Sequence, residues 1–486
     1  MIHRFVALLA MVLMASTLLS ALDLPIKTVS GTKYYFYKVG KKESVYGISK
    51  KLGITREDIV RYNPAAEDGV KKGQTLLFPV DDFVPVLPAE EAVTEPIDAV
   101  QVEETYPEET AVEPKPELRS AISILMPFGL SAEEPSRTNR LALDFYKGFL
   151  IGLDTLADRR GDVEVNVFDI DGLNTAGIEN LLDSAVVALS AVIIVPEEES
   201  ILRTAAWKAE ERGNYILNVL NVPDTLYLSN PRVIQANTPQ RKMYELATEG
   251  LMQDFQGYTP VIIRNAEGKN EKEAFTAFAT GQFEQRGISP IVIEYKGNLL
   301  SADLEQLAEN PGKYVVIPSS GSLAEFNKFA HVLKAFRDRM MIAEPDEEGN
   351  IPEPATTVAV FGYPDWTAFR GDALDLLSKL NATVYSRFYD NFNGFASKGV
   401  EADFRRWYGT NIIESIPSHA LLGFDTACML VKNLRANDGE FDPMRPATYE
   451  GVQSVFRFGQ NGLGYSNSAL YLINYGTDGR ITARTL

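Results

Sequence analysis

Short apolar runs alternate with amphipathic helical segments from residue 120 onward, and this alternation restricts the fold more than any other feature of the 486-residue chain. Runs such as AISILMPF, SAVIIVP and KYVVIPSSGS are each followed by a segment with helical periodicity. This order is typical of parallel sheets covered on both faces, because each connection between parallel strands needs a crossover. A second series begins at TPVIIRN, so we expect two doubly wound α/β lobes rather than one very wide sheet.

Residues 81–119 separate this region from a shorter one at the N-terminus. The segment contains six prolines, and twelve Asp or Glu stand against two Lys or Arg. It has few large apolar side chains, so it cannot bury enough surface to offset the entropy of ordering its backbone. We predict a disordered acidic linker with a span between about 35 Å and about 120 Å.

The first 22 residues have the order of a secretory signal peptide. His3 and Arg4 precede an apolar stretch that ends in small residues near Ser20 and Ala21. Export is therefore expected, and an uncleaved N-terminal membrane anchor is the alternative. The formal net charge of -19 disfavours nucleic acid as a partner.

The residues that most often carry catalysis or bind metals are scarce. Cys428 is the single cysteine, which excludes an intramolecular disulfide and a thiolate zinc cluster. His331 and His419 are far apart in sequence, and no GxSxG motif is present. We therefore expect a protein without catalytic residues, cofactor or metal.

Residues 33–80 are predicted to form a small basic βααβ unit. TKYYFYKVGKK is typical of a strand, ESVYGISKKLG and TREDIVRYNP of two short helices, and GQTLLFPV of a closing strand. Between residues 27 and 80, eleven Lys or Arg stand against five Asp or Glu. This excess favours attraction to an anionic partner, although lysines that only keep a small domain soluble are an equal alternative.

This unit resembles a LysM domain, a module that binds peptidoglycan or chitin. The residues at the positions of the LysM pattern are Tyr37, Val39, Ser44, Val45, Tyr46, Ile48, Gly53, Ile54, Asn63, Pro64, Gly73, Gln74, Leu76, Phe78 and Pro79. The resemblance implies a glycan groove lined by Glu43, Ser44, Val45, Asn63, Pro64 and Ala65. Helical and strand spacing assigns Val39, Ile48, Leu52, Ile54, Ile59 and Leu76 to the core. Lys42 and Glu43 replace the usual Gly-Asp, which predicts a looser first loop.

Residues 120–486 resemble the type I periplasmic binding protein fold, which has two lobes. The resemblance rests on AISILMPF as the first strand, DFYKGFLIGLD as the first helix, and a C-terminal tail that contains SVFRFGQNGLGYSNSALYLINY. It implies three crossings between the lobes, near Asn237, Asp390 and Met444. Lobe one would then comprise about 120–237 and 390–444, and lobe two about 238–389 and 445–486.

Ligands of this fold bind between the lobes, at the carboxyl ends of strands. The residues expected there are Phe128, Glu198, Ser200, Asn221, Ser319, Ser320, Ser322, Tyr363 and Trp366. Glu198 stands among three consecutive glutamates, which would repel the carboxylate of an amino acid. PSSGS has the form of an anion-binding turn, or of a plain serine N-cap. The aromatic residues of FGYPDW could stack on a ligand or pack against the next helix.

These observations favour a noncatalytic, exported, peptidoglycan-binding protein of the periplasm. The large domain would dock a cell-wall synthesis or transport protein, or sense a small-molecule ligand. The second hypothesis is a periplasmic receptor for a solute such as an amino acid or peptide. The third is a cell-wall hydrolase with an unrecognised site.

Overall fold

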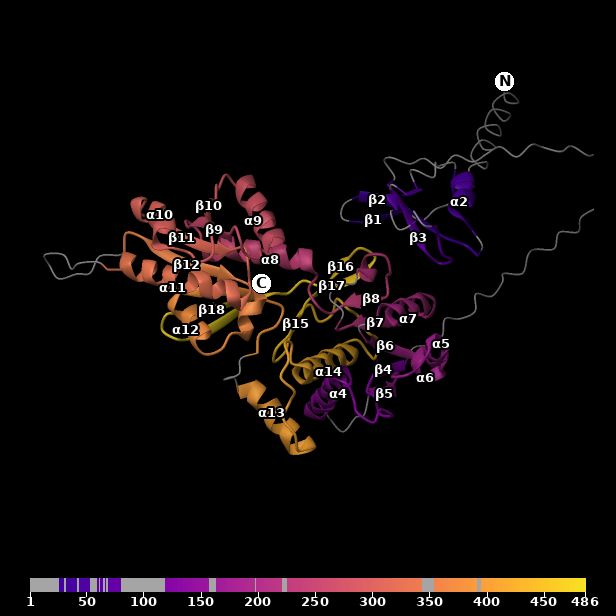
Figure 1. Cartoon of the computed structure of the whole chain (residues 1–486). Helices are drawn as coiled ribbons and strands as arrows, with labels where there is room; N and C mark the ends of the chain where they lie inside the picture. Colours follow the sequence, from indigo (N-terminus) through magenta and orange to yellow (C-terminus); the bar gives the residue numbers. More distant parts are fainter. Residues whose placement is uncertain are drawn as a thin grey trace, which may run out of the picture. The chain divides into compact units, whose positions relative to one another are not determined.

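The computed structural model describes residues 26–29, 32–41, 43–52, 59–60, 62–63, 66, 69–79, 119–156, 163–196, 198–220, 225–342, 354–390 and 395–486. They form two compact units, a small N-terminal one and a large one that begins after Lys115 (Figure 1). The expected signal peptide and the expected linker up to residue 118 lie outside the described residues.

The small unit is built on a three-stranded antiparallel sheet in which β2 (Thr32–Lys38) lies between β1 (Ile26–Val29) and β3 (Thr75–Pro79). Helix α2 (Val45–Leu52) covers the sheet and begins where the first helix was expected. The strand β1 was not predicted, because it lies before residue 33. The buried core of this unit consists of Tyr37, Val39, Val45, Ile48, Leu52, Ile59, Ala66, Leu76 and Phe78. Five of the six predicted core residues are among them, and Ile54 is outside the described residues.

Lobe one of the large unit contains a seven-stranded sheet in the order β16-β17-β8-β7-β6-β4-β5. The strands are β4 (Arg119–Met126), β5 (Glu164–Asp169), β6 (Ser190–Val195), β7 (Tyr215–Asn218), β8 (Val233–Gln235), β16 (Phe458–Asn461) and β17 (Gly464–Asn467). Strands β4 to β8 are parallel, as the alternating pattern predicts. Helices α4 (Arg137–Thr155) and α14 (His419–Ala436) share one core with the sheet. Helices α5 (Thr175–Asp183), α6 (Ala185–Ala188) and α7 (Glu199–Arg212) contribute to a second core.

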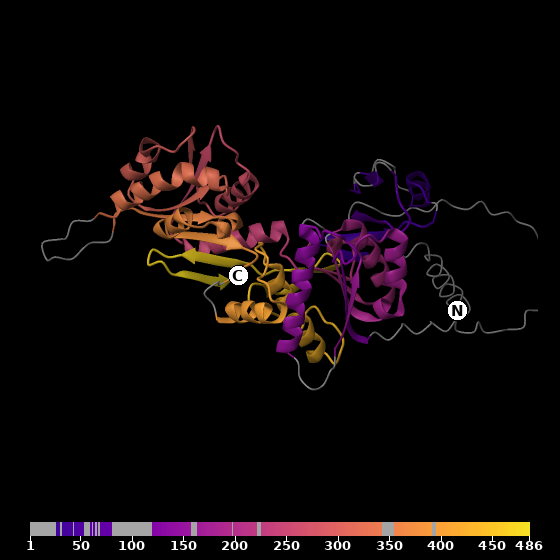
Figure 2. The same cartoon turned by 60° about the horizontal axis from the view of Figure 1, so that its bottom comes forward.

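Lobe two contains another seven-stranded sheet, in the order β10-β9-β11-β12-β13-β18-β19. The strands are β9 (Thr259–Asn265), β10 (Ile291–Tyr295), β11 (Lys313–Pro318), β12 (Thr357–Gly362), β13 (Ala382–Ser386), β18 (Tyr471–Tyr475) and β19 (Ile481–Thr485). The first five are parallel, whereas β18 and β19 form an antiparallel hairpin at one edge. The helices are α8 (Gln240–Asp254), α9 (Glu273–Gln285), η3 (Ser301–Leu304), α10 (Glu305–Glu309), α11 (Leu323–Met340), η4 (Pro364–Ala368) and α12 (Asp372–Lys379). The protein therefore has the two-lobed α/β architecture that the sequence predicts (Figure 2).

The third passage between the lobes is not near Met444, where it was expected. After α13 (Phe395–Tyr408), α14 and the short strands β14 (Tyr449–Glu450) and β15 (Val455–Phe456), the chain still adds β16 and β17 to the lobe-one sheet. Strand β17 pairs in parallel with β8, with Tyr465 opposite Ile234. The chain enters the lobe-two sheet only at β18, so residues 458–467 belong to lobe one.

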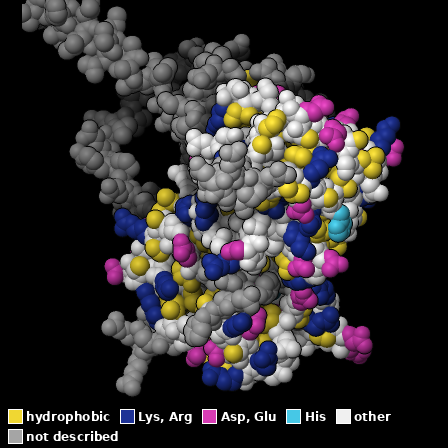
Figure 3. Space-filling model, turned by 90° about the vertical axis from the view of Figure 1, so that its left-hand side faces the viewer, with side chains coloured by type: hydrophobic (Ala, Val, Ile, Leu, Met, Phe, Trp, Pro, Cys, Tyr) yellow, Lys and Arg dark blue, Asp and Glu magenta, His cyan; other side chains and the backbone are white. Residues whose placement is uncertain are grey.

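One face of the large unit carries charged side chains of both signs. On the face that lies to the left in Figure 1, basic and acidic side chains are interspersed (Figure 3). Among the helices of the described residues, none has the length and apolar character needed to cross a membrane.

Candidate functional site

Glu43, the first residue of the expected glycan groove, is committed to contacts within its own unit. Its carboxylate accepts hydrogen bonds from the backbone nitrogen of Gly40 at 2.7 Å and from the Tyr37 hydroxyl at 2.7 Å. Lys51 Nζ lies 3.0 Å from the same carboxylate. Burial alone would raise the pKa of Glu43, but these donors outweigh it and lower the pKa. The first loop was expected to be looser because Lys42 and Glu43 stand in place of Gly-Asp. The contacts of the Glu43 side chain instead hold this loop together.

The other described groove residues have mainly structural contacts. Ser44 is exposed, and its hydroxyl caps α2 by accepting from the backbone nitrogen of Gly47 at 3.2 Å. Val45 is buried in the core. Asn63 binds both backbone groups of Leu77: its Nδ2 donates to the carbonyl at 3.0 Å, and its Oδ1 accepts from the amide at 2.8 Å. Pro64 and Ala65 lie outside the described residues.

The surface of this unit carries several exposed lysines. They are Lys38, Lys41, Lys51, Lys71 and Lys72. Because few side chains of the predicted groove are free to reach a ligand, recognition of a sugar there would depend on exposed backbone groups and on Ser44. The lysines would add long-range attraction to an anionic polymer.

In lobe one, the backbone of the loop after β4 already binds a carboxylate of the protein itself. The Asp169 carboxylate, at the end of β5, accepts from the backbone nitrogens of Phe128 at 2.8 Å, Gly129 at 3.3 Å and Leu130 at 2.8 Å. Burial alone would raise the pKa of Asp169, but these backbone donors lower it. The Phe128 ring is buried and packs against Tyr146. This loop therefore presents neither a free cluster of donors nor an open aromatic face.

Glu198 and Ser200 are the exposed members of the expected lobe-one set. They lie at the start of α7, and the Ser200 hydroxyl donates to Glu198 Oε1 at 2.6 Å. Glu199 is paired with Arg203 at 2.7 Å. Asn221 is outside the described residues. The local charge at this helix start is therefore set by carboxylates, as the sequence indicates.

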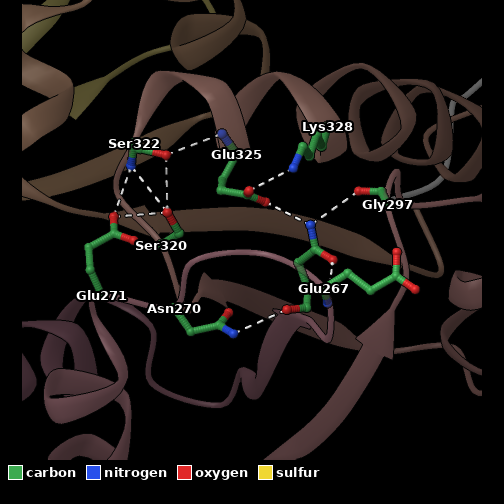
Figure 4. A network of polar contacts seen from close by, with 9 residues as sticks. Glu267, Asn270, Glu271, Gly297, Ser320, Ser322, Glu325 and Lys328 are labelled. Atoms are coloured by element: carbon green, nitrogen blue, oxygen red, sulfur yellow. Dashed lines mark hydrogen bonds and ion pairs between the residues drawn. The ribbon is translucent and has the colours of Figure 1, made fainter.

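In lobe two, the sequence PSSGS could form an anion-binding turn or a plain serine N-cap, and in the structure the Glu271 carboxylate is bound at this turn. Glu271 Oε1 accepts from the Ser320 hydroxyl at 2.9 Å and from the backbone nitrogens of Gly321 at 2.8 Å and Ser322 at 3.1 Å (Figure 4). Burial alone would raise the pKa of Glu271, but the donors lower it. Ser322 also caps α11, since its hydroxyl accepts from the Glu325 nitrogen at 3.2 Å. Ser319 is buried beside this turn.

Tyr363 and Trp366 are fully buried and do not line an open surface. The Tyr363 hydroxyl donates to the carbonyl of Pro318, and Trp366 Nε1 donates to the carbonyl of Gly321 at 3.1 Å. Both rings pack among other aromatic side chains. The ring centroids of Phe326 and Trp366, for example, are 5.0 Å apart. These aromatic residues therefore bind the backbone of the turn that holds Glu271, and they do not stack on a ligand.

Sequence reasoning missed the residues that define both strand-end loops, Asp169 and Glu271. The motif DIDG carries a weak signal for Asp169, because acids at a strand end often bind nearby backbone nitrogens. Glu271 has no comparable signal, since it lies fifty residues before the turn that it fills. Within the described residues, no group of three or more His, Cys, Asp or Glu is arranged to hold a metal ion.

Comparisons with known proteins identify the fold. No protein-family model and no curated protein matches this sequence. A Rhodospirillum rubrum protein assigned as a branched-chain amino acid ABC transporter is 14% identical, with a TM-score of 0.51, and the match covers 76% of this chain and all of that one (100%). A Desulfitobacterium hafniense ABC transporter substrate-binding protein in complex with leucine is 17% identical, with a TM-score of 0.39 over 76% of this chain and 100% of that one. Full-length LpoA from Haemophilus influenzae is 13% identical, with a TM-score of 0.44 over 75% of this chain and 59% of that one. At 14% identity, the likeness to the Rhodospirillum rubrum protein shows the two-lobed periplasmic-binding-protein-like fold alone.

Proposed function

We propose that this chain, whose large unit has the two-lobed fold of periplasmic binding proteins, is a noncatalytic exported protein held at the cell wall. Its basic N-terminal unit binds glycan that contains N-acetylglucosamine, in the manner of a LysM domain. Its large unit docks a cell-wall synthesis or transport protein, or senses a ligand at the wall. The linker between them keeps the acidic large unit at a distance from the anionic wall.

Support for wall binding comes from the N-terminal unit. Six described apolar residues of the LysM-like pattern are buried in one small core, which supports folding as an independent module. They are Tyr37, Val39, Val45, Ile48, Leu76 and Phe78. Ser44 is exposed at the start of α2, where helix N–H groups can contact acetamido groups. The exposed lysines are positively charged and would attract the carboxylates of peptidoglycan stem peptides.

The observation that carries the proposal for the large unit is the occupation of its strand-end loops. Asp169 in lobe one and Glu271 in lobe two take the backbone donors that a ligand carboxylate would need. A free amino acid would have to displace these internal carboxylates, which are bound by several donors each. A receptor that grips an amino acid at these loops is therefore disfavoured, and docking or sensing at another surface is favoured.

The alternative is a solute receptor for a small molecule such as a peptide. The two-lobed fold favours it, because closure of two lobes around a ligand is how such receptors work. A hydrolase is the least supported candidate, and digestion of purified sacculi by the chain would revive it.

Co-sedimentation with purified peptidoglycan sacculi tests the proposal. The full-length chain should pellet with sacculi, whereas a chain that lacks residues 26–79 should stay in the supernatant. Raising the salt to about 0.5 M separates the two sources of affinity, because it screens the lysines but leaves contacts in a glycan groove. Binding that vanishes with salt, or that survives the deletion, would contradict the proposal.

A further inference from the structure

A large cavity lies between the lobes, away from the strand-end loops. Its volume is about 870 Å³, and it is lined by lobe two at η4, α12 and the β18–β19 hairpin and by lobe one at α13 and residues 412–418. Figure 2 shows the hairpin in yellow on the side of the lobe-two sheet that faces α13. Cavities of about 300 to 1,000 Å³ are typical of ligand sites. None of the residues expected to bind a ligand is among those that line this cavity.

The cavity has an apolar lining with room for side chains of a ligand. Ile473 and Tyr475 from β18 are buried beneath it, and Ile412 lies on the lobe-one side. Two further apolar side chains at the cavity are unusually exposed: 56% of Ile416 and 42% of Ile481 is accessible. Covering these two side chains would be favourable, by about 25 cal/mol for each Å² removed from water.

The charges that line the cavity are separated by lobe. Arg370 and Arg480 come from lobe two, whereas Glu401 and Glu414 come from lobe one and Asp390 from the segment that joins the lobes. Burial raises the pKa of Asp390, and the nearby charge of Glu401 raises it further, although a hydrogen bond from Ser397 opposes this. A cation placed beside these carboxylates would relieve their mutual repulsion. A ligand that fits both walls therefore carries a positive group at one end and a negative group at the other.

Strand β19 is the edge of the lobe-two sheet, and its residue Ile481 lines the cavity. The backbone nitrogen of Gly476 donates to the carbonyl of Arg480 at 2.8 Å, and that of Leu486 donates to the carbonyl of Leu470 at 2.7 Å. In an antiparallel pair, residues that bond the neighbouring strand alternate with residues whose backbone groups point away from it. Ile481 follows Arg480, so its N–H and C=O point away from β18. Backbone groups with this orientation on an edge strand can pair with a further strand.

We propose that this cavity binds a short zwitterionic peptide in an extended conformation, with its amino end toward Glu401 and its carboxylate toward Arg480. The backbone of the peptide pairs with the outer edge of β19 near Ile481, and its apolar side chains cover Ile416 and Ile481. A peptide satisfies all three features, because it has opposite terminal charges, a backbone that can extend a sheet, and apolar side chains. Since the walls belong to different lobes, the bound peptide bridges them. The inference deepens the ligand-sensing part of the proposed function and rests on it only in assigning the large unit a ligand.

The test uses the full-length chain and the tripeptide leucyl-alanyl-leucine in four forms: free ends, N-acetylated, C-amidated, and blocked at both ends. Isothermal titration calorimetry should show the tightest binding for the free peptide, with about tenfold weaker binding when either end is blocked. These measurements on the unaltered protein need no variant. Equal affinity for the free and the doubly blocked peptide, or no binding of any form, would overturn the proposal. Tighter binding of free leucine than of the tripeptide would also overturn it and would point to an amino-acid receptor.

Charge reversals then assign each end to its wall. Arg480→Glu should remove the preference for the free over the amidated carboxyl end and keep the preference for the free amino end. Glu401→Lys should do the opposite. The matched control is Glu210→Lys, which should leave both preferences unchanged. Glu210 is an exposed residue of α7 in lobe one. The same effect of Glu210→Lys as of Glu401→Lys would mean that only net charge matters and would contradict the assigned site. Because none of these variants alters the N-terminal unit, failure here leaves sedimentation with sacculi unaffected, and the two hypotheses fail separately.

Discussion

Glu271 Oε1 lies 2.8 Å from the backbone nitrogen of Gly321, fifty residues later in the chain. The contact joins the segment just before α9 to the turn between β11 and α11, and the Ser320 hydroxyl binds the same oxygen (Figure 4). In lobe one, Asp169 binds the loop after β4 in the same way. In each lobe, a carboxylate of the same lobe thus occupies the donors of the strand-end loop: Asp169 in lobe one and Glu271 in lobe two.

Removing the Glu271 carboxylate should open an anion site. Glu271→Ala leaves the Gly321 and Ser322 nitrogens and the Ser320 hydroxyl without this partner, which should cost about 1 to 3 kcal/mol of unfolding free energy. Thermal unfolding in sodium acetate, compared with sodium chloride at the same ionic strength, should recover part of that loss. The unaltered protein should show no such difference. Equal unfolding of the variant in the two salts would contradict the assignment of this turn as an anion site.

Asp425 should make the stability of the large unit fall as the pH rises from about 4 to 7. Its carboxylate, in α14, is fully buried, accepts from the backbone nitrogens of Val452 and Gln453 at 2.6 and 2.9 Å, and also accepts from that of Ser454. Burial raises the pKa of Asp425 to about 6, above its ordinary value of 3.8. The folded state therefore holds the proton more tightly than the unfolded state, so this contribution is complete below the unfolded pKa and is lost as the pH passes the folded one.

Comparison with Asp425→Asn, which cannot titrate, isolates this effect. The unfolding free energy of the wild type minus that of the variant should decrease between pH 4 and pH 7, by at most about 3 kcal/mol. Urea titrations at a series of pH values measure it. A difference that grows with pH would mean that the three backbone donors stabilise the charged carboxylate more than burial destabilises it.

The contact between α4 and α14 should tolerate no side chain at its two central glycines. A Cβ at Gly148 would lie 1.8 Å from the carbonyl oxygen of Ala420, and a Cβ at Gly423 would lie 1.9 Å from that of Phe145. Since these neighbours are backbone atoms, Gly148→Ala should lower the unfolding free energy by about 3 kcal/mol, the upper end of the usual cost of overpacking. Gly281→Ala in α9 is the control: nothing lies within 4 Å of its Cβ position, and helix propensity predicts a gain of up to about 1 kcal/mol. Equal stability of the two variants would refute the close packing.

Asn63 should matter more for the stability of the N-terminal unit than Ser44. Asn63→Ala removes both hydrogen bonds to the Leu77 backbone and should cost about 1 to 3 kcal/mol. Ser44→Ala removes one exposed cap and should cost about 1 kcal/mol or less. Hydrogen exchange of the Leu77 amide in the full-length chain measures the difference. Faster exchange in Ser44→Ala than in Asn63→Ala would contradict the structural role of Asn63.

The sequence predicts the architecture well where the pattern is long. Helices α4 and α11 and the strands beside them have clear periodicity, because each buries a continuous apolar face. The N-cap at Ser322 is confirmed by its bond to the Glu325 nitrogen. Strands β16 and β17 have four residues each, and whether such short strands join one sheet or the other depends on partners far away in sequence. The predicted crossing near Met444 is wrong for this reason.

The candidate site was harder to predict than the fold. Polar and aromatic residues at strand ends have the composition of a ligand site, but composition does not reveal whether the chain itself already satisfies them. The partners that do so, Asp169 for Phe128 and Glu271 for Ser320, lie 41 and 49 residues away. Tyr363 and Trp366 are similar, since only packing shows that their polar atoms bind the carbonyls of Pro318 and Gly321.

The most direct test of wall binding is a titration of the ¹⁵N-labelled full-length chain with N-acetylglucosamine tetramer, followed by two-dimensional NMR. The account predicts saturable shifts of the amides of Ser44, Val45 and Asn63, with no response of the amides around Gly321 and none to maltotetraose. An unchanged spectrum, or shifts confined to the large unit, would contradict the claim that the N-terminal unit holds this protein at the wall.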